Sequence, residues 1–127
     1  LFQKTETRFT VLYALDGYDE ISLTGATKAF SNEGEQVLAP RDFGVSAHKA
    51  TAIAGGDNIT SSATIFMDIL QNKGSQEQQN VVCANAGMAL ATSLNLTPLE
   101  GFEKAKVALE SGKALAAFKT LQKLSQS

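Results

Sequence analysis

The sequence is poor in the residues that usually carry covalent or metal-based chemistry. Its 127 residues include one cysteine, Cys83, and one histidine, His48. A single cysteine forms no disulfide within the chain, which fits a reducing compartment such as the cytoplasm. The sequence also holds no metal-spaced Cys/His cluster and no Ser-His-Asp or Cys-His arrangement. We therefore expect Cys83 to be a small core residue and His48 a loop residue.

Long hydrophobic runs and an excess of positive charge are also missing. No apolar run approaches the roughly 20 residues that span a bilayer, and we see no signal-peptide pattern. The formal net charge is −2 and the pI about 5.3, so no basic stripe attracts nucleic acid. We expect neither a membrane nor a nucleic-acid partner, and a cytoplasmic location is the default. Hydrophobic residues make up 43% of the chain, which is enough for one globular core.

The first half of the sequence predicts few strands. Residues 8–15 are β-rich and apolar at their centre, which favours a strand buried on both faces, as in α/β proteins. Residues 35–39 predict a second, shorter strand that Pro40 ends. Between these two segments, residues 22–30 are ambiguous. Residues 41–58 are rich in Gly and Ala and predict loops and short turns.

The second half predicts about four helices. Residues 60–71 carry apolar side chains at helical spacing, with Asp57 as a candidate cap. Ser75 and Gln78 have the form of a capping box for a second helix. Small residues in that helix would let a neighbour approach closely. The residues that we expect on or beside its buried face are Val82, Cys83, Ala86, Ala89, Leu90 and Ser93.

The last two helices have the clearest start signal in the chain. Thr97, Pro98 and Glu100 supply an N-cap, a proline at the first helical position and an acid at the third. This helix is expected to end at Ser111-Gly112, and the last one covers about 113–123. Two strands cannot cover the apolar faces of four helices. We therefore expect an α/β fold that is completed by strands from a longer protein. The chain also opens with Leu1-Phe2-Gln3 and no initiating methionine, which agrees with that expectation.

Three carboxylates gather after the first predicted strand, in the stretch LDGYDEIS. Ligands of α/β sheets bind at the carboxyl ends of strands, so Asp19 and Glu20 occupy a usual site position. Mg²⁺ takes one or two protein carboxylates and completes its octahedron with water and substrate phosphates. The alternative is that Asp16 and Glu20 solvate a strand end or cap a helix. The segment AGGDN, at 54–58, resembles a phosphate-binding loop, but a turn into the next helix is the simpler interpretation.

Five segments occur in the order found in the C-terminal part of anthranilate phosphoribosyltransferases. They are FTVLYALDGYDEISLTG, EQVLAPRDFGV, IAGGDNITSSATIFMDIL, VVCANAGMALATS and EGFEKAKVALESGKALAAFKTL. The sequence resembles this family over residues 9–124. The resemblance implies a partial domain of the phosphoribosyltransferase and nucleoside-phosphorylase type. Residues 1–127 would be the C-terminal portion of the α/β catalytic domain, without the N-terminal helical domain.

The resemblance also implies a reaction. Members of the family transfer the 5-phosphoribosyl group of phosphoribosyl diphosphate to anthranilate in tryptophan biosynthesis, and they are usually homodimers. Asp19 and Glu20 match the family's Gly-x-Asp-Glu motif and by that resemblance bind Mg²⁺ at the diphosphate. The family's Gly-Thr-Gly-Gly-Asp loop, its Lys-His-Gly segment and its anthranilate-contacting residues are not in this sequence. We therefore expect the chain to be inactive alone.

Two other functions are compatible with the same pattern. The first is a non-catalytic relative that acts as a binding module. The second is a pyrimidine nucleoside phosphorylase, which would carry a different lysine-containing motif that we do not find. Both carboxylates of the Asp19-Glu20 pair are present, which favours the transferase.

Overall fold

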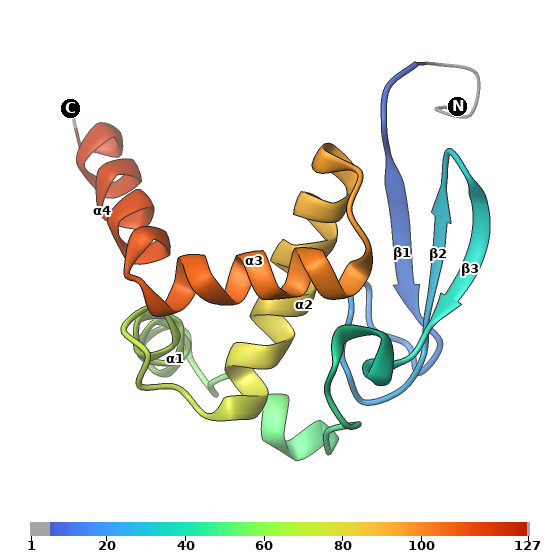
Figure 1. The fold of residues 1–127 in the computed structure, drawn as a ribbon. Coiled ribbons are helices and arrows are strands. Elements are labelled where there is room, and N and C mark those ends of the chain that lie inside the picture. The colour runs from blue at the N-terminus through green and yellow to red at the C-terminus, as the bar shows by residue number, and fades with distance from the viewer. Residues whose placement is uncertain (1–5, 127) are drawn as a thin grey trace.

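The computed structural model describes residues 6–126, so the opening Leu1–Gln3 lies outside the described part. A small sheet stands at one end of the molecule, α1 and α4 at the other, and α2 and α3 cross between them (Figure 1). In chain order the elements are β1 Thr10–Ala14, β2 Thr27–Ser31, β3 Gly34–Leu38, η2 Pro40–Phe43, η3 Ala50–Ile53, α1 Ile59–Leu70, α2 Gln76–Leu94, α3 Pro98–Glu110 and α4 Lys113–Ser125. The expected α/β class with few strands and four helices is confirmed.

The three strands form one antiparallel sheet in the order β1-β2-β3. Leu12 lies opposite Ala29, and Ala29 lies opposite Gln36. The strand β2 falls within the segment that the sequence left ambiguous. A tight turn at 32–33 joins it to β3 and sets the register of the pair.

The expectation that the first strand is buried on both faces is wrong for this chain. Burial alternates along β1: Ala14 is 2% exposed, whereas Val11 is 51% and Tyr13 42% exposed. The inner face packs toward α2, where the Thr10 and Thr92 hydroxyls are 2.6 Å apart. An antiparallel sheet is commonly covered on one face only, and here the outer face carries the exposed Val11 and Tyr13 beside the Lys28–Glu35 ion pair.

The two central helices cross at a pair of glycines. A Cβ added to Gly87 would lie 2.6 Å from the backbone N of Phe102, and one added to Gly101 would collide with the carbonyl oxygen of Gly87. The helices can approach this closely only because both positions lack a side chain. Phe102 and Leu109, both 3% exposed, fill the core beside the crossing.

The buried face of α2 differs from the expected one. Val82, Ala86, Ala89 and Ser93 are exposed, and of the expected set only Cys83 is fully buried. The glycine contact turns the helix so that another stripe faces the core. This stripe consists of Asn80, Cys83, Ala84, Gly87, Met88 and Ala91.

The helix starts follow the predicted capping signals, with one correction. Ser75 and Gln78 cap α2 reciprocally, and so do Thr97 and Glu100 at α3. The first helix is capped by Asn58 and not by Asp57: the backbone N–H of Ser61 donates to Asn58 Oδ1 at 2.9 Å. Among residues 6–126, no helix combines the length and apolarity needed to cross a membrane.

The α3 cap makes a testable contribution to stability. Thr97→Ala is expected to lower the free energy of unfolding by about 1 kcal/mol, because an orphan N–H loses its acceptor.

Hydrogen bonds from the backbone N–H and the hydroxyl of Thr97 lower the pKa of Glu100. The stability that comes from the ionised Glu100 carboxylate is present above the pKa of an unfolded glutamate, about 4.3. It is lost as the pH falls through the lower pKa of the folded state.

The measurement is the urea midpoint of the chain and of its Thr97→Ala and Glu100→Gln variants between pH 6 and pH 3. Glu100→Gln keeps an oxygen acceptor but cannot titrate, so its midpoint should fall less steeply with acid. Parallel pH profiles for all three proteins would contradict the assignment.

Candidate metal-binding loop

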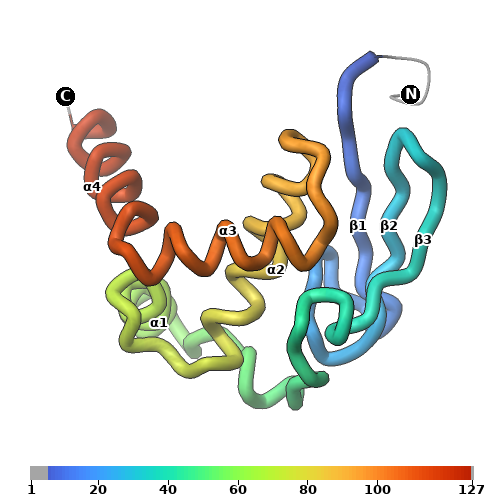
Figure 2. Tube along the Cα trace, in the orientation of Figure 1, coloured from blue at the N-terminus to red at the C-terminus, as the bar shows by residue number. Residues whose placement is uncertain are grey.

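The connection between β1 and β2 carries the acidic residues singled out in the sequence. It lies at the same end of the sheet as the segment that follows β3 (Figure 2). Asp19 and Glu20 are both exposed in this loop, at the carboxyl end of β1. Both carboxylates are therefore accessible from the solvent.

The third carboxylate, that of Asp16, accepts hydrogen bonds from two hydroxyl groups. Ser22 Oγ donates to Asp16 Oδ1 at 3.4 Å, and Thr24 Oγ1 donates to Asp16 Oδ2. The two hydroxyls are themselves 2.8 Å apart, and Ser22 is 2% exposed. Asp16, although exposed, therefore ties the start of the loop to residues 22 and 24. The suggestion that it only solvates a strand end is incomplete, because its carboxylate accepts from both side chains.

Two buried side chains anchor the loop to the core. Ile21 and Leu23 are each 1% exposed. Leu23 has φ 61°, in the left-handed region that a bulky residue rarely adopts. Its carbonyl oxygen accepts the backbone N–H of His48 at 2.8 Å. Such strain persists only where surrounding contacts impose it, and it clusters at functional sites.

The backbone of Ile21, the residue after Glu20, is held from helix α2. Its N–H donates to Asn85 Oδ1 at 3.0 Å, and its carbonyl accepts from Asn85 Nδ2 at 2.8 Å. The same Nδ2 also donates to the carbonyl of Val81 at 2.9 Å, one turn earlier in α2. Sequence reasoning missed this contact, since an asparagine inside a helix of small residues was the only signal.

The donor set suits a hard cation that brings other ligands with it. Within residues 6–126 no group of three or more His, Cys, Asp or Glu side chains converges, so the chain offers no closed metal cage. Mg²⁺ needs only one or two carboxylates when water and phosphates complete its shell. Asp19 and Glu20 are two exposed carboxylates of this kind.

The other candidate residues fall outside this loop. The AGGDN segment is a turn into α1, in which Gly56 lies against Ser61 and Ser62. His48 Nε2 lies 3.3 Å from the side-chain amide of the buried Asn80. Cys83 is 3% exposed and is a core residue, as expected. This burial, reinforced by the charge of Glu110, raises the pKa of its thiol to about 11. A thiol in that state is a poor nucleophile at neutral pH.

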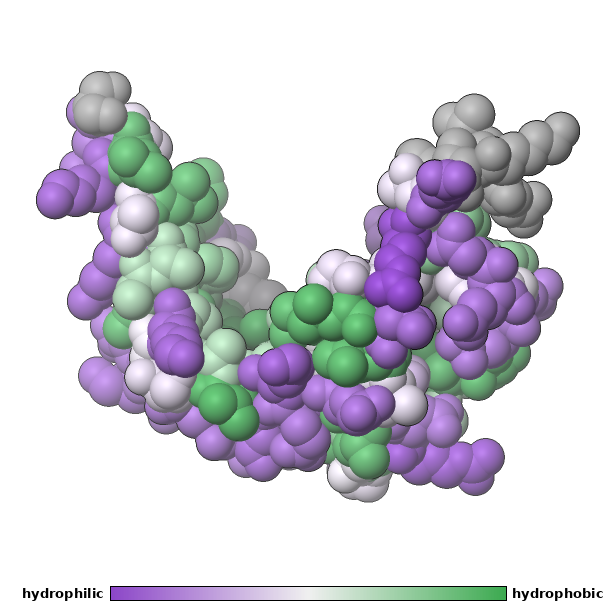
Figure 3. Space-filling model, turned by 45° about the horizontal axis from the view of Figure 1, so that its top comes forward, coloured by the Kyte–Doolittle hydropathy of each residue, from purple (hydrophilic) through white to green (hydrophobic). Residues whose placement is uncertain are grey.

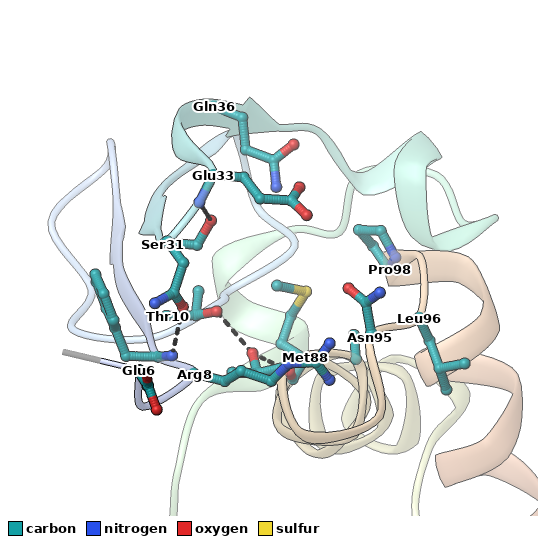
Figure 4. Close-up of a pocket in the computed structure, with 14 residues that line it drawn as sticks. Glu6, Arg8, Thr10, Ser31, Glu33, Gln36, Met88, Asn95, Leu96 and Pro98 are labelled. Carbon is teal, nitrogen blue, oxygen red and sulfur yellow. Dashed lines mark hydrogen bonds between the residues drawn. The ribbon is translucent and has the colours of Figure 1, made fainter. Parts of the chain in front are cut away.

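A separate cavity of about 400 Å³ opens between the sheet and helices α2 and α3. In Figure 4 the side chains of Glu33 and Gln36 face those of Met88 and Asn95 across it. Asp19 and Glu20 do not line this cavity. The cavity and the loop are therefore different places on the molecule.

Residues 2–115 match the family described as "Glycosyl transferase family, a/b domain". The chain belongs to this family. An anthranilate phosphoribosyltransferase from Christiangramia forsetii is 61% identical over 127 residues, which is all of this chain and 38% of the relative. The resemblance seen in the sequence is thereby confirmed, and the chain spans little more than a third of this relative's length.

Solved structures show the same fold at lower identity. The crystal structure of anthranilate phosphoribosyltransferase from Thermus thermophilus gives a TM-score of 0.81 at 23% identity, covering 89% of this chain and 34% of that one. The Saccharomyces cerevisiae enzyme in complex with PRPP and Mg gives 0.78 at 20% identity, covering 88% and 32%. At these identities the likeness supports the fold.

Proposed function

We propose that this chain supplies the metal-binding edge of an anthranilate phosphoribosyltransferase. Residues 1–127 would be the C-terminal portion of the α/β catalytic domain of a homodimeric enzyme. The observation that carries the proposal is the exposed Asp19-Glu20 pair, held at the end of β1 in a chain 61% identical to a protein of that name. The name of this relative favours the transferase over a binding module.

The chemistry explains why two carboxylates belong at this place. Cleavage of the anomeric bond leaves oxocarbenium-like charge on the ribose and negative charge on the departing diphosphate. Mg²⁺ supplies Lewis-acid neutralisation of that negative charge when it is bound. Asp19 and Glu20 hold and orient the cation, and the hydrogen bonds of Asp16 keep their loop closed. The catalytic contribution of the chain is positioning and electrostatics, so the buried Cys83 is not needed as a nucleophile.

The exposed apolar surface supports the idea that more protein completes the site. Helices α1 and α4 have no fully buried residue. In Figure 3, apolar patches border the hollow between the end of the molecule that carries α1 and α4 and the end that carries the sheet. A groove of about 800 Å³ between α2 and the α3–α4 pair is lined by Leu90, Leu94, Leu96, Leu99, Val107 and Ala108, together with Glu100, Glu103, Lys104 and Lys113. Apolar surface of this extent usually has a partner.

The sheet shows the same feature on its outer side. Val11 is 51% and Val37 56% exposed, next to Tyr13, which is 42% exposed. Part of the outer face of the sheet is therefore apolar surface available to another part of the fold. We propose that the isolated chain lacks transferase activity because this cover and the remaining substrate contacts come from other parts of the fold.

A chimera tests the proposed function. In it, this chain replaces the matching 127 residues of the Christiangramia forsetii relative. We expect the chimera, with Mg²⁺, to convert anthranilate and phosphoribosyl diphosphate to phosphoribosylanthranilate, and the chain alone to show no turnover. A folded chimera without turnover would contradict the proposed reaction, and turnover by the chain alone would contradict its incompleteness.

A further inference from the structure

We infer that Asn85 is a positioning residue for the acidic loop: its side-chain amide fixes the backbone immediately after Glu20 and so sets where the two carboxylates point. The inference rests on the proposed function of Asp19 and Glu20. It assigns a role in that site to a residue of helix α2, which is 64 positions away from Ile21 in the sequence.

The geometry is that of a two-point clamp. Asn85 Oδ1 accepts from the N–H of Ile21 at 3.0 Å, and Asn85 Nδ2 donates to the carbonyl of the same residue at 2.8 Å. A side-chain amide that satisfies both backbone groups of one residue replaces the ladder contacts of a neighbouring strand. It fixes the orientation of that peptide segment as well as its position.

The clamp itself is rigid. The Nδ2 group of Asn85 also donates to the carbonyl of Val81 at 2.9 Å, which fixes the rotamer of the side chain against its own helix. The helix α2 is in turn locked against α3 by the contact of Gly87 with Gly101. The loop is therefore tied to a helix that packs closely against its neighbour.

The position of the clamp in the loop gives it a functional meaning. The hydrogen bonds of Asp16 with Ser22 and Thr24 connect the chain before Ile21 with the chain after it, and Glu20 precedes Ile21 directly. Exposed carboxylates on an unrestrained loop would have to be ordered each time a cation binds. A clamp next to Glu20 removes that cost beforehand, so its loss should weaken cation binding more than it weakens the fold.

Three variants test the inference. Asn85→Leu keeps the branched shape of the side chain but removes its hydrogen bonds to Ile21 and Val81, and Asn85→Asp keeps an oxygen for the N–H of Ile21 but loses the donor. Thr92→Val is the matched control, because it too removes a hydrogen bond between α2 and another segment. The bond that it removes joins Thr92 to Thr10 of β1 and does not involve the loop. The first measurement is amide hydrogen exchange in the chain. Asn85→Leu should accelerate exchange at Ile21 by about tenfold and leave α3 unchanged.

The second measurement is the Mg²⁺ concentration that gives half-maximal turnover in the chimera. Asn85→Leu should raise it by about tenfold, the low end of the effect of removing groups that orient metal ligands. The KM for anthranilate should stay within about twofold. Asn85→Asp should cause a smaller rise in this Mg²⁺ concentration. It tests the positioning role if Asn85→Leu does not fold. Thr92→Val should leave the Mg²⁺ requirement unchanged.

The two proposals fail in different ways. If the Asn85 variants change the Mg²⁺ requirement no more than Thr92→Val does, in a chimera that is otherwise active, the positioning role is overturned and the proposed function stands. Unchanged exchange at Ile21 in Asn85→Leu would overturn the clamp as well. A folded chimera that shows no Mg²⁺-dependent turnover contradicts the proposed function, and the positioning role with it.

Discussion

The double substitution Asp19→Asn, Glu20→Gln in the chimera is expected to lower turnover by about 10³-fold. A metal ion that neutralises a leaving group supplies several kcal/mol of transition-state stabilisation, and about 4 kcal/mol corresponds to three powers of ten in rate. Both side chains are exposed, so their amides should leave the fold intact. The measurement is kcat at increasing Mg²⁺ concentration, with circular dichroism as the check on folding.

A matched control removes the same number of charges elsewhere. Glu33 lies in the turn between β2 and β3 and Glu110 at the end of α3, and both are exposed. The double variant Glu33→Gln, Glu110→Gln should retain turnover within a few-fold. Equal losses in both double variants would indicate a general effect of charge, and an unchanged Mg²⁺ requirement in the Asp19-Glu20 variant would refute the metal assignment.

Gly101→Ala should destabilise the chain by about 3 kcal/mol, although helix propensity alone predicts the opposite. Alanine is favoured over glycine inside a helix by about 1 kcal/mol. A Cβ at Gly101, however, would collide with the carbonyl oxygen of Gly87, which is helical backbone and cannot turn aside. Overpacking against atoms that cannot move costs about 1–3 kcal/mol or more, so the steric term dominates.

The measurement is urea unfolding of the chain followed by circular dichroism. Gly55→Ala is the control, because a Cβ there meets nothing within 4 Å. It should change the free energy of unfolding by less than about 0.5 kcal/mol. If Gly101→Ala behaves like Gly55→Ala, the close crossing of α2 and α3 does not exist in solution.

Local signals in the sequence were sufficient for the helices. The helices α2 and α3 start where the side chains of Ser75 and Thr97 accept backbone N–H groups, and α3 ends before Gly112, which has φ 84°. These are contacts between residues three or four apart, so they can be read from spacing alone.

Contacts between distant segments could not be predicted in this way. The buried stripe of α2 is set by Gly101, which lies on another helix, and its own alanines and glycine give little hydrophobic contrast. The strand β2 mixes Thr27 and Lys28 with apolar residues, so only its pairing with β1 and β3 identifies it. The clamp of Asn85 on Ile21 joins residues 64 positions apart.

The acidic pair itself was identified from the sequence, and its surroundings were not. The position of Asp19 and Glu20 after an apolar strand was enough to suggest a metal edge. The strained backbone of Leu23 and the hydroxyl network around Asp16 became visible only in three dimensions. These neighbours restrain the loop that carries the two exposed acids.

The most direct test of the account is the stoichiometry of the reaction in the chimera. Diphosphate release and anthranilate consumption should be measured together, with and without Mg²⁺ and in the Asp19→Asn, Glu20→Gln variant. The proposed metal role of Asp19 and Glu20 predicts one diphosphate released per anthranilate consumed when Mg²⁺ and both carboxylates are present, and turnover lower by about 10³-fold in the variant. Equal, stoichiometric turnover in the variant, or turnover that is independent of Mg²⁺, would contradict it.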